Sequence, residues 1–201
     1  MGQTGTKSLV KMIEEQGWGR MWSRDRPNLY NGEYWAWDNG AYSWWVNGQA
    51  FHDVSFLKRL WRDYLIGVPY FAACPDMPGE GEDSLEFSLW WIDRLPKAWK
   101  WYLVVQDGMT VEMIEPHIHL FKGIFLGGTN EFKSSADVWC DYIHSKRKLF
   151  HYGRCGTLEK LHHAKRIGAD SIDSSTLVQN PHLMGRFISA YRDEHHQLSF
   201  I

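Results

Sequence analysis

Two short apolar runs, each followed at once by polar or glycine residues, decide the fold of this chain. YLVV at residues 102–105 precedes QDG at 106–108, and GIFL at residues 123–126 precedes GG at 127–128. Such runs are typical of strands buried on both faces of a parallel sheet. The amphipathic stretch at residues 111–119 between them predicts a helix. A strand, a helix and a second strand with short connections indicate a parallel βα unit.

The same alternation extends through most of the chain. Other apolar or aromatic runs predict strands at residues 19–23, 34–37, 69–73, 149–152 and 171–172. Amphipathic stretches predict helices at residues 7–16, 54–65, 84–95, 135–146, 158–167 and 182–194. Six or seven βα units of about 25 residues each indicate an α/β fold. They suit a compact (β/α)8 barrel of the TIM type, with an open doubly wound sheet as the alternative, and the positions of the polar residues decide between the two.

Length and composition set the class of protein. A chain of 201 residues fits one core, so we expect residues 1–201 to form a single barrel domain without a linker. Apolar residues make up 44% and charged residues 23%, which excludes a disordered or fibrous chain. The twelve Trp residues are unusually many. We interpret most of them as core residues, with stacking on nucleobases as the alternative.

Charge and cysteine usage limit the partners and the compartment. The formal net charge of -2 gives no overall basic field, so a nucleic acid would need a local basic patch. The three cysteines, Cys74, Cys140 and Cys155, are odd in number and far apart, which favours a reducing compartment over a disulfide framework. The chain shows no signal peptide and no apolar run long enough for a membrane span, so a cytoplasmic protein without membrane association is expected.

Residues with binding or catalytic chemistry directly follow five of the predicted strands. In a barrel, all five positions converge on the mouth at the carboxyl ends of the strands, where such enzymes place their sites. Each residue taken alone has a structural explanation, because Asp caps helices and Gly forms turns. Their recurrence after five strands favours a site formed by Asp38, Asp76, Gln106, the pair Gly127 and Gly128, and Asp173.

Four ordered motifs resemble those of the queuine and archaeosine tRNA-guanine transglycosylases, and more closely those of their DNA-modifying relatives in phages and bacterial islands. DNGAYS at residues 38–43 resembles the family's Asp-Ser-Gly-Gly-aromatic-Gln motif, and VVQDG at 104–108 its Val-Gln-Gly-Gly strand end. FLGG at 125–128 resembles its Ile-Gly-Gly loop. The longest similarity runs from GT at 156–157 to DSID at 170–173, where the family has Gly-Thr-Pro-Glu, a helix, a glycine and the nucleophilic Asp.

This resemblance implies an enzyme that exchanges guanine in DNA for a 7-deazaguanine base, such as preQ0 or a relative, without a cofactor. By resemblance, Asp173 is the nucleophile that bonds to C1′ of the nucleoside as an oxocarbenium-like state forms. Asp38 is the general acid and base, which protonates the departing guanine and then deprotonates the incoming base. That role requires a raised pKa for Asp38, from burial or from a neighbouring carboxylate.

The resemblance also assigns the groups that would recognise the base. Asp76 would accept hydrogen bonds from N1 and the 2-amino group of guanine, which selects guanine over adenine. The side chain of Gln106 and the backbone N–H of Gly128, in the turn that begins at Gly127, would bind the rest of the base edge. Tyr42 would stack on the ring. Arg154, at a strand end, is the candidate contact to a phosphate of the nucleic acid.

Several features depart from the family. Residues 174–201 contain no Cys, so the structural zinc site of the tRNA enzymes is not expected, and no metal is assigned. The family's Pro-Thr-Arg after the nucleophile is replaced by SST at 174–176, which favours DNA over tRNA as the partner. Asp107 stands where the family has Gly, and we interpret it as a turn residue rather than a contact to the base.

Three other functions remain open from the sequence. The first is a minimal tRNA-guanine transglycosylase with the same chemistry. The second is a nucleoside N-glycosidase or deoxyribosyltransferase, which would need a small closed pocket and no basic rim. The third is a non-catalytic barrel that binds a nucleic acid or a protein, in which paired roles for Asp38 and Asp173 would have no purpose.

Overall fold

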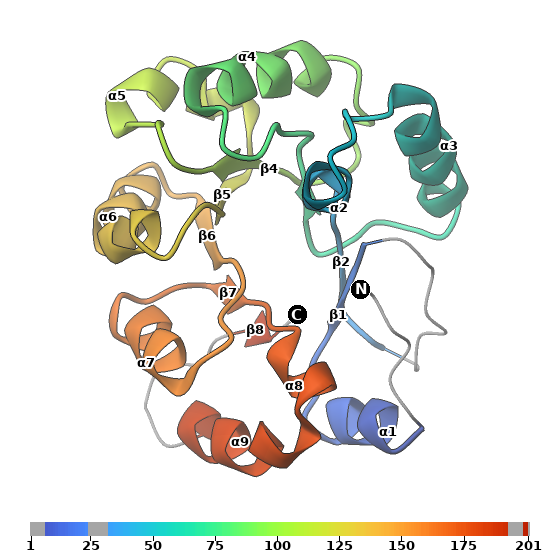
Figure 1. Cartoon of the computed structure of the whole chain (residues 1–201), viewed down its shortest axis with the longest axis vertical. Helices are drawn as coiled ribbons and strands as arrows, with labels where there is room; N and C mark the ends of the chain where they lie inside the picture. The colour runs from blue at the N-terminus through green and yellow to red at the C-terminus, as the bar shows by residue number, and fades with distance from the viewer. Residues whose placement is uncertain (1–6, 24–31, 193–198, 201) are drawn as a thin grey trace.

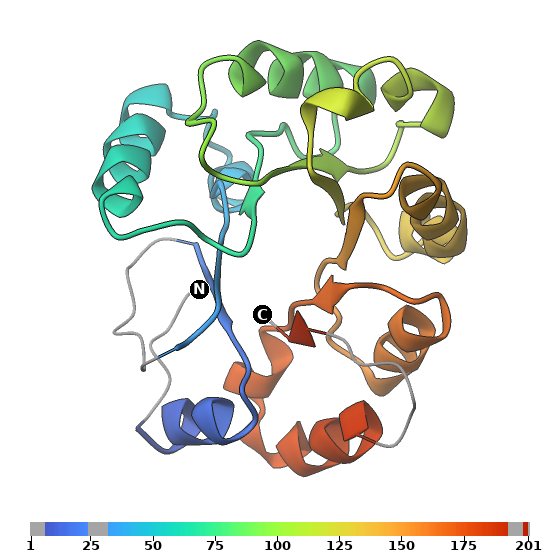
Figure 2. The same cartoon turned by 180° about the vertical axis from the view of Figure 1, so that it is seen from behind.

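The computed structural model describes residues 7–23, 32–192 and 199–200. The strands form one parallel sheet whose spatial order follows the sequence, and Figures 1 and 2 show that this sheet curls around an axis. Its strands are β1 (Arg20–Trp22), β2 (Trp35–Trp37), β3 (Ala72–Ala73), β4 (Trp101–Val105), β5 (Gly123–Leu126), β6 (Leu149–Tyr152), β7 (Ser171–Ile172) and β8 (Ser199–Phe200).

Helices surround the curled sheet (Figure 1). The α-helices are α1 (Lys7–Glu15), α2 (Ala41–Val46), α3 (Asp53–Tyr64), α4 (Gly81–Ile92), α5 (Val111–Ile114), α6 (Ala136–Ser145), α7 (Leu158–Arg166), α8 (Thr176–Gln179) and α9 (Met184–Arg192). Short 3-10 turns are η1 (Ile118–Leu120), η2 (Phe132–Ser135) and η3 (Pro181–Leu183). In Figure 1, α2 and α8 lie nearer the middle of the ring than the other helices.

The α/β class and the curled parallel sheet are confirmed, but closure of the sheet into a barrel is not shown. Each strand pairs with the next along the chain, from β1 to β8. Within the described ranges, no hydrogen-bonded pairing joins β8 to β1, so the observed sheet has two edges.

Local chemistry explains where the observed elements differ from the predicted ones. The helix predicted at 111–119 ends at Ile114 and continues only as the turn η1, because Pro116 cannot donate a backbone hydrogen bond inside a helix. Helix α2 was not predicted and begins directly after Gly40, whose φ of 85° reverses the chain at the end of β2. The last helix begins at Met184 rather than at 182, and residues 193–194 of the prediction lie outside the described residues.

The two faces of the sheet bury different residues, because successive side chains of a strand point to opposite sides. Trp37 packs outward against Phe56 of α3, with ring centroids 5.4 Å apart. Its neighbour Ala36 points the other way and joins an inner cluster with Phe71 and Tyr102. We call these three residues the interior cluster; Phe125 packs against them.

Most of the Trp residues serve the core, as the sequence indicates. The buried ones are Trp18, Trp22, Trp35, Trp37, Trp91, Trp99, Trp101 and Trp139. Trp37 contacts both Trp99 and Trp101 edge-on, which ties β2 to β4 and the segment before it. Trp45, Trp61 and Trp90 are about half exposed and remain available for other contacts.

Candidate active site at the carboxyl ends of the strands

The strand order brings the residues singled out in the sequence to one edge of the sheet. Asp38 directly follows β2, Gln106 follows β4, Gly127 follows β5, and Asp173 follows β7. Asp76 lies in the loop after β3 and Arg154 lies two residues after β6. Because all strands are parallel, these positions share the carboxyl edge, where α/β proteins bind their ligands.

Asp173 is held by directed hydrogen bonds on one oxygen. Its Oδ1 accepts from Nε2 of His151 at 3.1 Å and from the backbone N of Arg154 at 2.8 Å. Burial by itself raises the pKa of this carboxyl group. The hydrogen bond from His151, the N–H of Arg154 and the positive charge of Lys133 outweigh burial and hold the pKa below its ordinary value. Asp173 is therefore a carboxylate at neutral pH, with its side chain 16% exposed.

Asp38 has the opposite electrostatic environment. Burial raises its pKa, and the negative charge of Asp173 raises it further, so the two carboxyl groups interact across the edge of the sheet. The N–H of Gly40, which donates to Asp38 Oδ1 at 3.0 Å, and the charge of Arg59 lower the pKa without reversing the shift. Asp38 thus has the raised pKa that an acid and base role requires.

Arg59 supports Asp38 from helix α3. Its Nη2 donates to the backbone carbonyl of Asp38, and its guanidinium lies 4.1 Å from the ring centroid of Trp37. Burial lowers the pKa of Arg59 to about 10, which leaves it a cation at neutral pH. This arginine could not be distinguished from a solvated helix residue in the sequence, because its contacts come from the fold.

Asp76 is buried, and both of its oxygens accept hydrogen bonds. Asn39 Nδ2 donates to Oδ1 at 2.6 Å, and Gln106 Nε2 donates to Oδ2 at 3.3 Å. Burial raises the pKa of Asp76 to about 7, and the nearby charge of Asp38 adds to the rise. Asp76 therefore changes its protonation state near neutral pH.

Gln106 uses its amide to hold the loop that follows β3. Besides Asp76, its Nε2 lies 3.0 Å from the carbonyl of Met77 and 2.7 Å from Oγ of Ser84. Its Oε1 accepts from the N of Gly79 at 2.8 Å. The side chain is 2% exposed, so in this structure it fixes the loop around Asp76 rather than presenting a free amide.

The loop after β5 requires glycine at residue 128. Gly128 has φ of 72°, and a Cβ there would lie 2.5 Å from Oδ2 of Asp107. Asp107 accepts from the N and the hydroxyl of Thr129, at 2.8 and 2.5 Å. Asp107 thus orders the turn, as the sequence indicates. The backbone N–H of Gly128 donates to none of the described residues.

Arg154 connects this loop to helix α2. Its Nη2 donates to the carbonyl of Gly128 at 2.9 Å, and its guanidinium carbon lies 4.8 Å from the centroid of the Tyr42 ring. Both side chains are exposed, Tyr42 to 50%. Arg154 also has φ of 52°, an uncommon conformation for a side chain with a Cβ. A cation and an aromatic ring therefore lie together at the rim of the acidic site.

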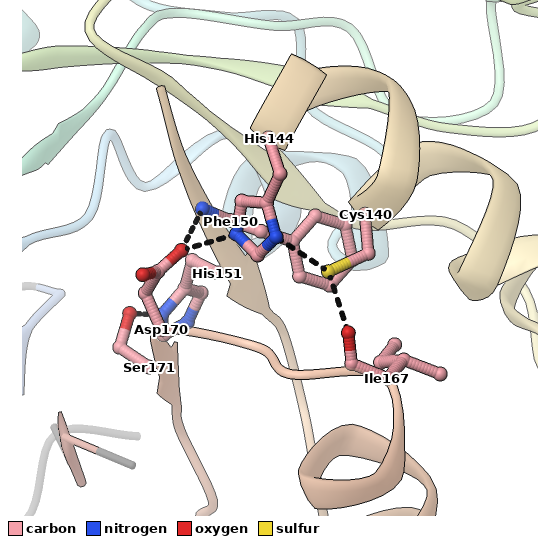
Figure 3. Close-up of polar contacts among 7 residues, drawn as sticks. All are labelled: Cys140, His144, Phe150, His151, Ile167, Asp170 and Ser171. Carbon is pink, nitrogen blue, oxygen red and sulfur yellow. Dashed lines mark hydrogen bonds and ion pairs between the residues drawn. The ribbon is translucent and has the colours of Figure 1, made fainter. Parts of the chain in front are cut away.

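Besides Arg59, the sequence analysis did not identify three further residues of the site: His151, Ser171 and Lys133. His151 is fully buried in β6, and its Nδ1 lies 2.8 Å from Oγ of Ser171 (Figure 3). Alternation along β6 and β7 puts both side chains on the face of Asp173, a signal that the strand pattern contained. Lys133 is 2% exposed, donates to the carbonyl of Gly153, and has a pKa lowered by burial to about 8. No sequence pattern distinguishes it.

A second polar cluster, formed by Cys140, His144 and Asp170, lies at the opposite end of β7 (Figure 3). His144 lies 3.7 Å from Cys140 Sγ and 2.9 Å from Asp170 Oδ2, which resembles the order of a thiol, an imidazole and a carboxylate in hydrolases. Cys140 is fully buried, donates to the carbonyl of Ile167, and burial raises its pKa to about 12. It stays a thiol, and the cluster is structural.

The described part of the chain contains no group of three or more His, Cys, Asp or Glu side chains that could hold a metal ion. Among those same residues, no helix is long and apolar enough to cross a membrane.

The fold and the site together define an α/β protein with interacting carboxylates at the carboxyl edge of a curled parallel sheet. Comparisons of the chain with models of protein families, with curated proteins and with solved structures find no match.

Proposed function

We propose that this protein is a base-exchange transglycosylase that removes guanine from DNA and inserts a 7-deazaguanine of the preQ0 type, on a sheet that works as a (β/α)8 barrel. The arrangement that supports this most is the placement of Asp38 and Asp173 at the same carboxyl edge of the sheet. Burial raises the pKa of Asp38 there, whereas the donors on Oδ1 of Asp173 lower the pKa of that group. A double displacement at a glycosidic carbon needs one proton donor and one ionised nucleophile.

The proposed reaction has two balanced halves. First, the Asp173 carboxylate bonds to C1′ while the bond from C1′ to the base breaks, and Asp38 gives its proton to the departing guanine. Then the incoming base gives its ring N–H proton to the Asp38 carboxylate, and its nitrogen attacks C1′. The bond to Asp173 breaks, and both enzyme groups return to their starting states.

Recognition of guanine is assigned to the groups between these two carboxylates. Asp76 accepts hydrogen bonds from N1 and the 2-amino group in its ionised form, and Gln106 holds it in place through the contact at 3.3 Å. The N–H of Gly128, which has no acceptor among the described residues, is suited to the O6 acceptor. Tyr42, half exposed on α2, provides a ring face for stacking.

Assignment of DNA as the partner rests on the resemblance to the DNA-modifying enzymes and on one surface feature. Arg154 is exposed at the rim and uses one nitrogen for Gly128, which leaves other N–H donors of its guanidinium for a phosphate. A target base in duplex DNA would have to flip out of the stack to reach Asp173.

A hydrolytic triad is the competing interpretation of the same atoms. Ser171, His151 and Asp173 lie in the order of a hydroxyl, an imidazole and a carboxylate, at 2.8 and 3.1 Å. A nucleophilic serine has to meet its substrate, yet Ser171 is 1% exposed and the accessible member is Asp173. The geometry therefore favours Asp173 as the group that reacts.

The test is incorporation of labelled preQ0 or guanine into DNA or tRNA by the full chain. We expect label in DNA, loss of incorporation in Asp173→Asn, and normal incorporation in Asp137→Asn, an exposed carboxylate of α6. Label in tRNA alone would identify the minimal tRNA enzyme. Release of guanine without exchange would identify a glycosidase. Absence of turnover on all substrates, with folded protein, would refute the proposal.

A further inference from the structure

The imidazole of His151 is locked in place behind the candidate nucleophile. It is fully buried on β6, and its ring packs against Phe71 and Phe125, with centroid distances of 4.6 Å to each. Its two nitrogens have one partner each, Ser171 Oγ at 2.8 Å and Asp173 Oδ1 at 3.1 Å. Close packing against these two rings leaves the imidazole little freedom to turn away from Asp173.

These contacts fix the tautomer of His151. Burial lowers its pKa, so the imidazole is neutral and has a single N–H. An ionised Asp173 can only accept a hydrogen bond, so the proton must be on Nε2. Nδ1 then accepts from the hydroxyl of Ser171, which is 1% exposed and directs its hydrogen to that nitrogen.

The two oxygens of Asp173 are therefore not equivalent. Oδ1 accepts from His151 Nε2 and from the backbone N of Arg154, at 3.1 and 2.8 Å. No described residue donates to Oδ2. Of the two oxygens, only Oδ2 has its lone pairs free to meet an electrophilic carbon.

We propose that His151 is a positioning residue that selects the reacting oxygen of Asp173: by binding Oδ1, it leaves Oδ2 to attack C1′ of the target nucleotide. This inference rests on the proposed function and deepens it. When the bond from Oδ2 to C1′ forms, Oδ1 becomes the carbonyl oxygen of the ester. When the incoming base breaks that bond, negative charge returns to the carboxylate, and the donors on Oδ1 stabilise it as the leaving group.

Removing the donor has different effects on the two halves of the reaction. His151→Phe keeps an aromatic ring packed against Phe71 and Phe125 but takes one hydrogen bond from Oδ1. Asp173 becomes a poorer leaving group, so the covalent adduct on DNA persists longer and exchange slows by about 10- to 100-fold. Because Asp173 then ionises at higher pH, the acid limb of the pH profile of the rate moves to higher pH.

Other charged or titratable groups face Asp173 and are unchanged in this variant. They are Lys133 from η2, Cys155 after β6, and Asp38 across the edge of the sheet. Since these groups stay constant, a shift of the acid limb is attributable to the lost contact with His151.

The experiment compares the wild type with His151→Phe, His151→Gln and Ser171→Ala. Gln places an N–H near the position of Nε2, so His151→Gln should recover most of the exchange rate that Phe loses. Ser171→Ala removes the hydroxyl that donates to Nδ1 of His151, so the imidazole proton is no longer restricted to Nε2. This variant should lose less rate than His151→Phe, and its acid limb should move in the same direction. The readouts are single-turnover exchange, the amount of protein–DNA adduct by mass spectrometry, and the pH profile.

The inference and the proposed function fail in different ways. If the wild type exchanges bases and His151→Phe has the same rate, adduct level and acid limb, the role of His151 is overturned while the function stands. If the wild type forms neither product nor adduct, the function is overturned. Nitrogen-15 NMR of His151 tests the positioning independently of activity: a proton on Nε2 alone at neutral pH supports it, and a proton on Nδ1 overturns it. If His151→Phe fails to fold, the exchange rate of His151→Gln and this spectrum test the role of His151.

Discussion

Asn39 donates from Nδ2 to Oδ1 of Asp76 at 2.6 Å and so joins the end of β2 to the loop that follows β3. The same nitrogen donates to the carbonyl of Cys74, and the side-chain oxygen of Asn39 accepts from the N of Ala41 at the start of α2. One buried amide therefore links two strand ends and a helix start. It also stabilises the ionised form of Asp76, the form that would accept from guanine in the proposed function.

Asn39→Ala should weaken binding of the base in a pH-dependent way. Without the amide, the pKa of Asp76 rises above its present value of about 7, so a smaller fraction is ionised at neutral pH. We expect KM for the base to rise by up to about tenfold per unit of pKa increase and to recover at higher pH. Initial rates at several pH values measure this. Ser88→Ala, which removes a buried hydrogen bond to Pro75 in the same loop, is the control and should leave the pH dependence of KM unchanged.

Asp76→Asn should change how stability depends on pH. The folded-state pKa of Asp76 is raised above its ordinary value of 3.8, so its stabilising contribution is present below that value and is lost as pH rises to about 7. Over that window the wild type should lose up to about 4 kcal/mol that the variant keeps. Urea unfolding of both proteins between pH 4 and 8 measures the difference. Parallel stability curves would contradict the raised pKa.

Lys133→Met should lower activity through Asp173. Lys133 is buried beside that carboxylate and its positive charge helps to keep it ionised. Without the charge, we expect about a tenfold lower rate at neutral pH and an acid limb that moves upward. Wild-type activity should also fall as pH rises through about 8, where Lys133 loses its proton.

A second buried lysine provides the control for this variant. Lys165 donates to the carbonyls of Ala190 and Tyr191, so Lys165→Met also loses buried hydrogen bonds to backbone oxygen. It should destabilise the fold while the folded protein keeps the rate and pH profile of the wild type. Equal losses of rate in both variants would show that Lys133 acts only on stability.

The sequence predicted the sheet well because the pattern of a buried strand is local. Runs such as GIFL at 123–126 and LFHY at 149–152 form strands with the predicted bounds, and Asp173 follows β7 as expected. What the sequence could not show depends on contacts between distant segments. The engagement of Gln106 with Ser84, the stacking of Arg59 on Trp37 and the burial of Lys133 all arise from the fold.

His151 is the instructive intermediate case. It lies in a run that predicts a strand, and its alternation with Phe150 puts it on the interior face, so its direction could be derived. Its partner could not be derived, because the register of β6 with β7 places Ser171 opposite His151 only after the sheet forms. A lone histidine in an apolar strand is otherwise taken as a core residue.

Asp170→Asn should destabilise the protein without affecting the site. Oδ2 of Asp170 accepts from the N of Phe150 at 2.7 Å and from Nε2 of His144 at 2.9 Å, which ties β6 and α6 to the start of β7. The neutral amide oxygen that takes that place accepts more weakly than a carboxylate oxygen, so we expect a loss of about 1 kcal/mol in the free energy of unfolding. Thermal unfolding measures the loss, and unchanged activity of the folded variant separates it from Asp173→Asn.

Two arginines at opposite ends of β6 provide a matched test of the proposed nucleic-acid surface. Arg154 and Arg147 both have positive φ, 52° and 56°, and both are exposed. Only Arg154 lies at the carboxyl edge, with its guanidinium over Tyr42. Arg154→Ala keeps the backbone N–H to Asp173 and removes the charge. Affinity for DNA should therefore fall for all sequences alike, and the slope of log affinity against log salt should decrease by about 1.

Arg147→Ala loses the same charge at the same kind of backbone position but at the amino end of β6, away from Tyr42 and Gly128. Fluorescence anisotropy with labelled DNA at several salt concentrations should give the wild-type slope for this variant. Saturating DNA should restore the single-turnover rate of Arg154→Ala, because its N–H still holds Oδ1 of Asp173. An equal loss of affinity in both variants would assign the effect to net charge alone and would remove Arg154 from the DNA-binding surface.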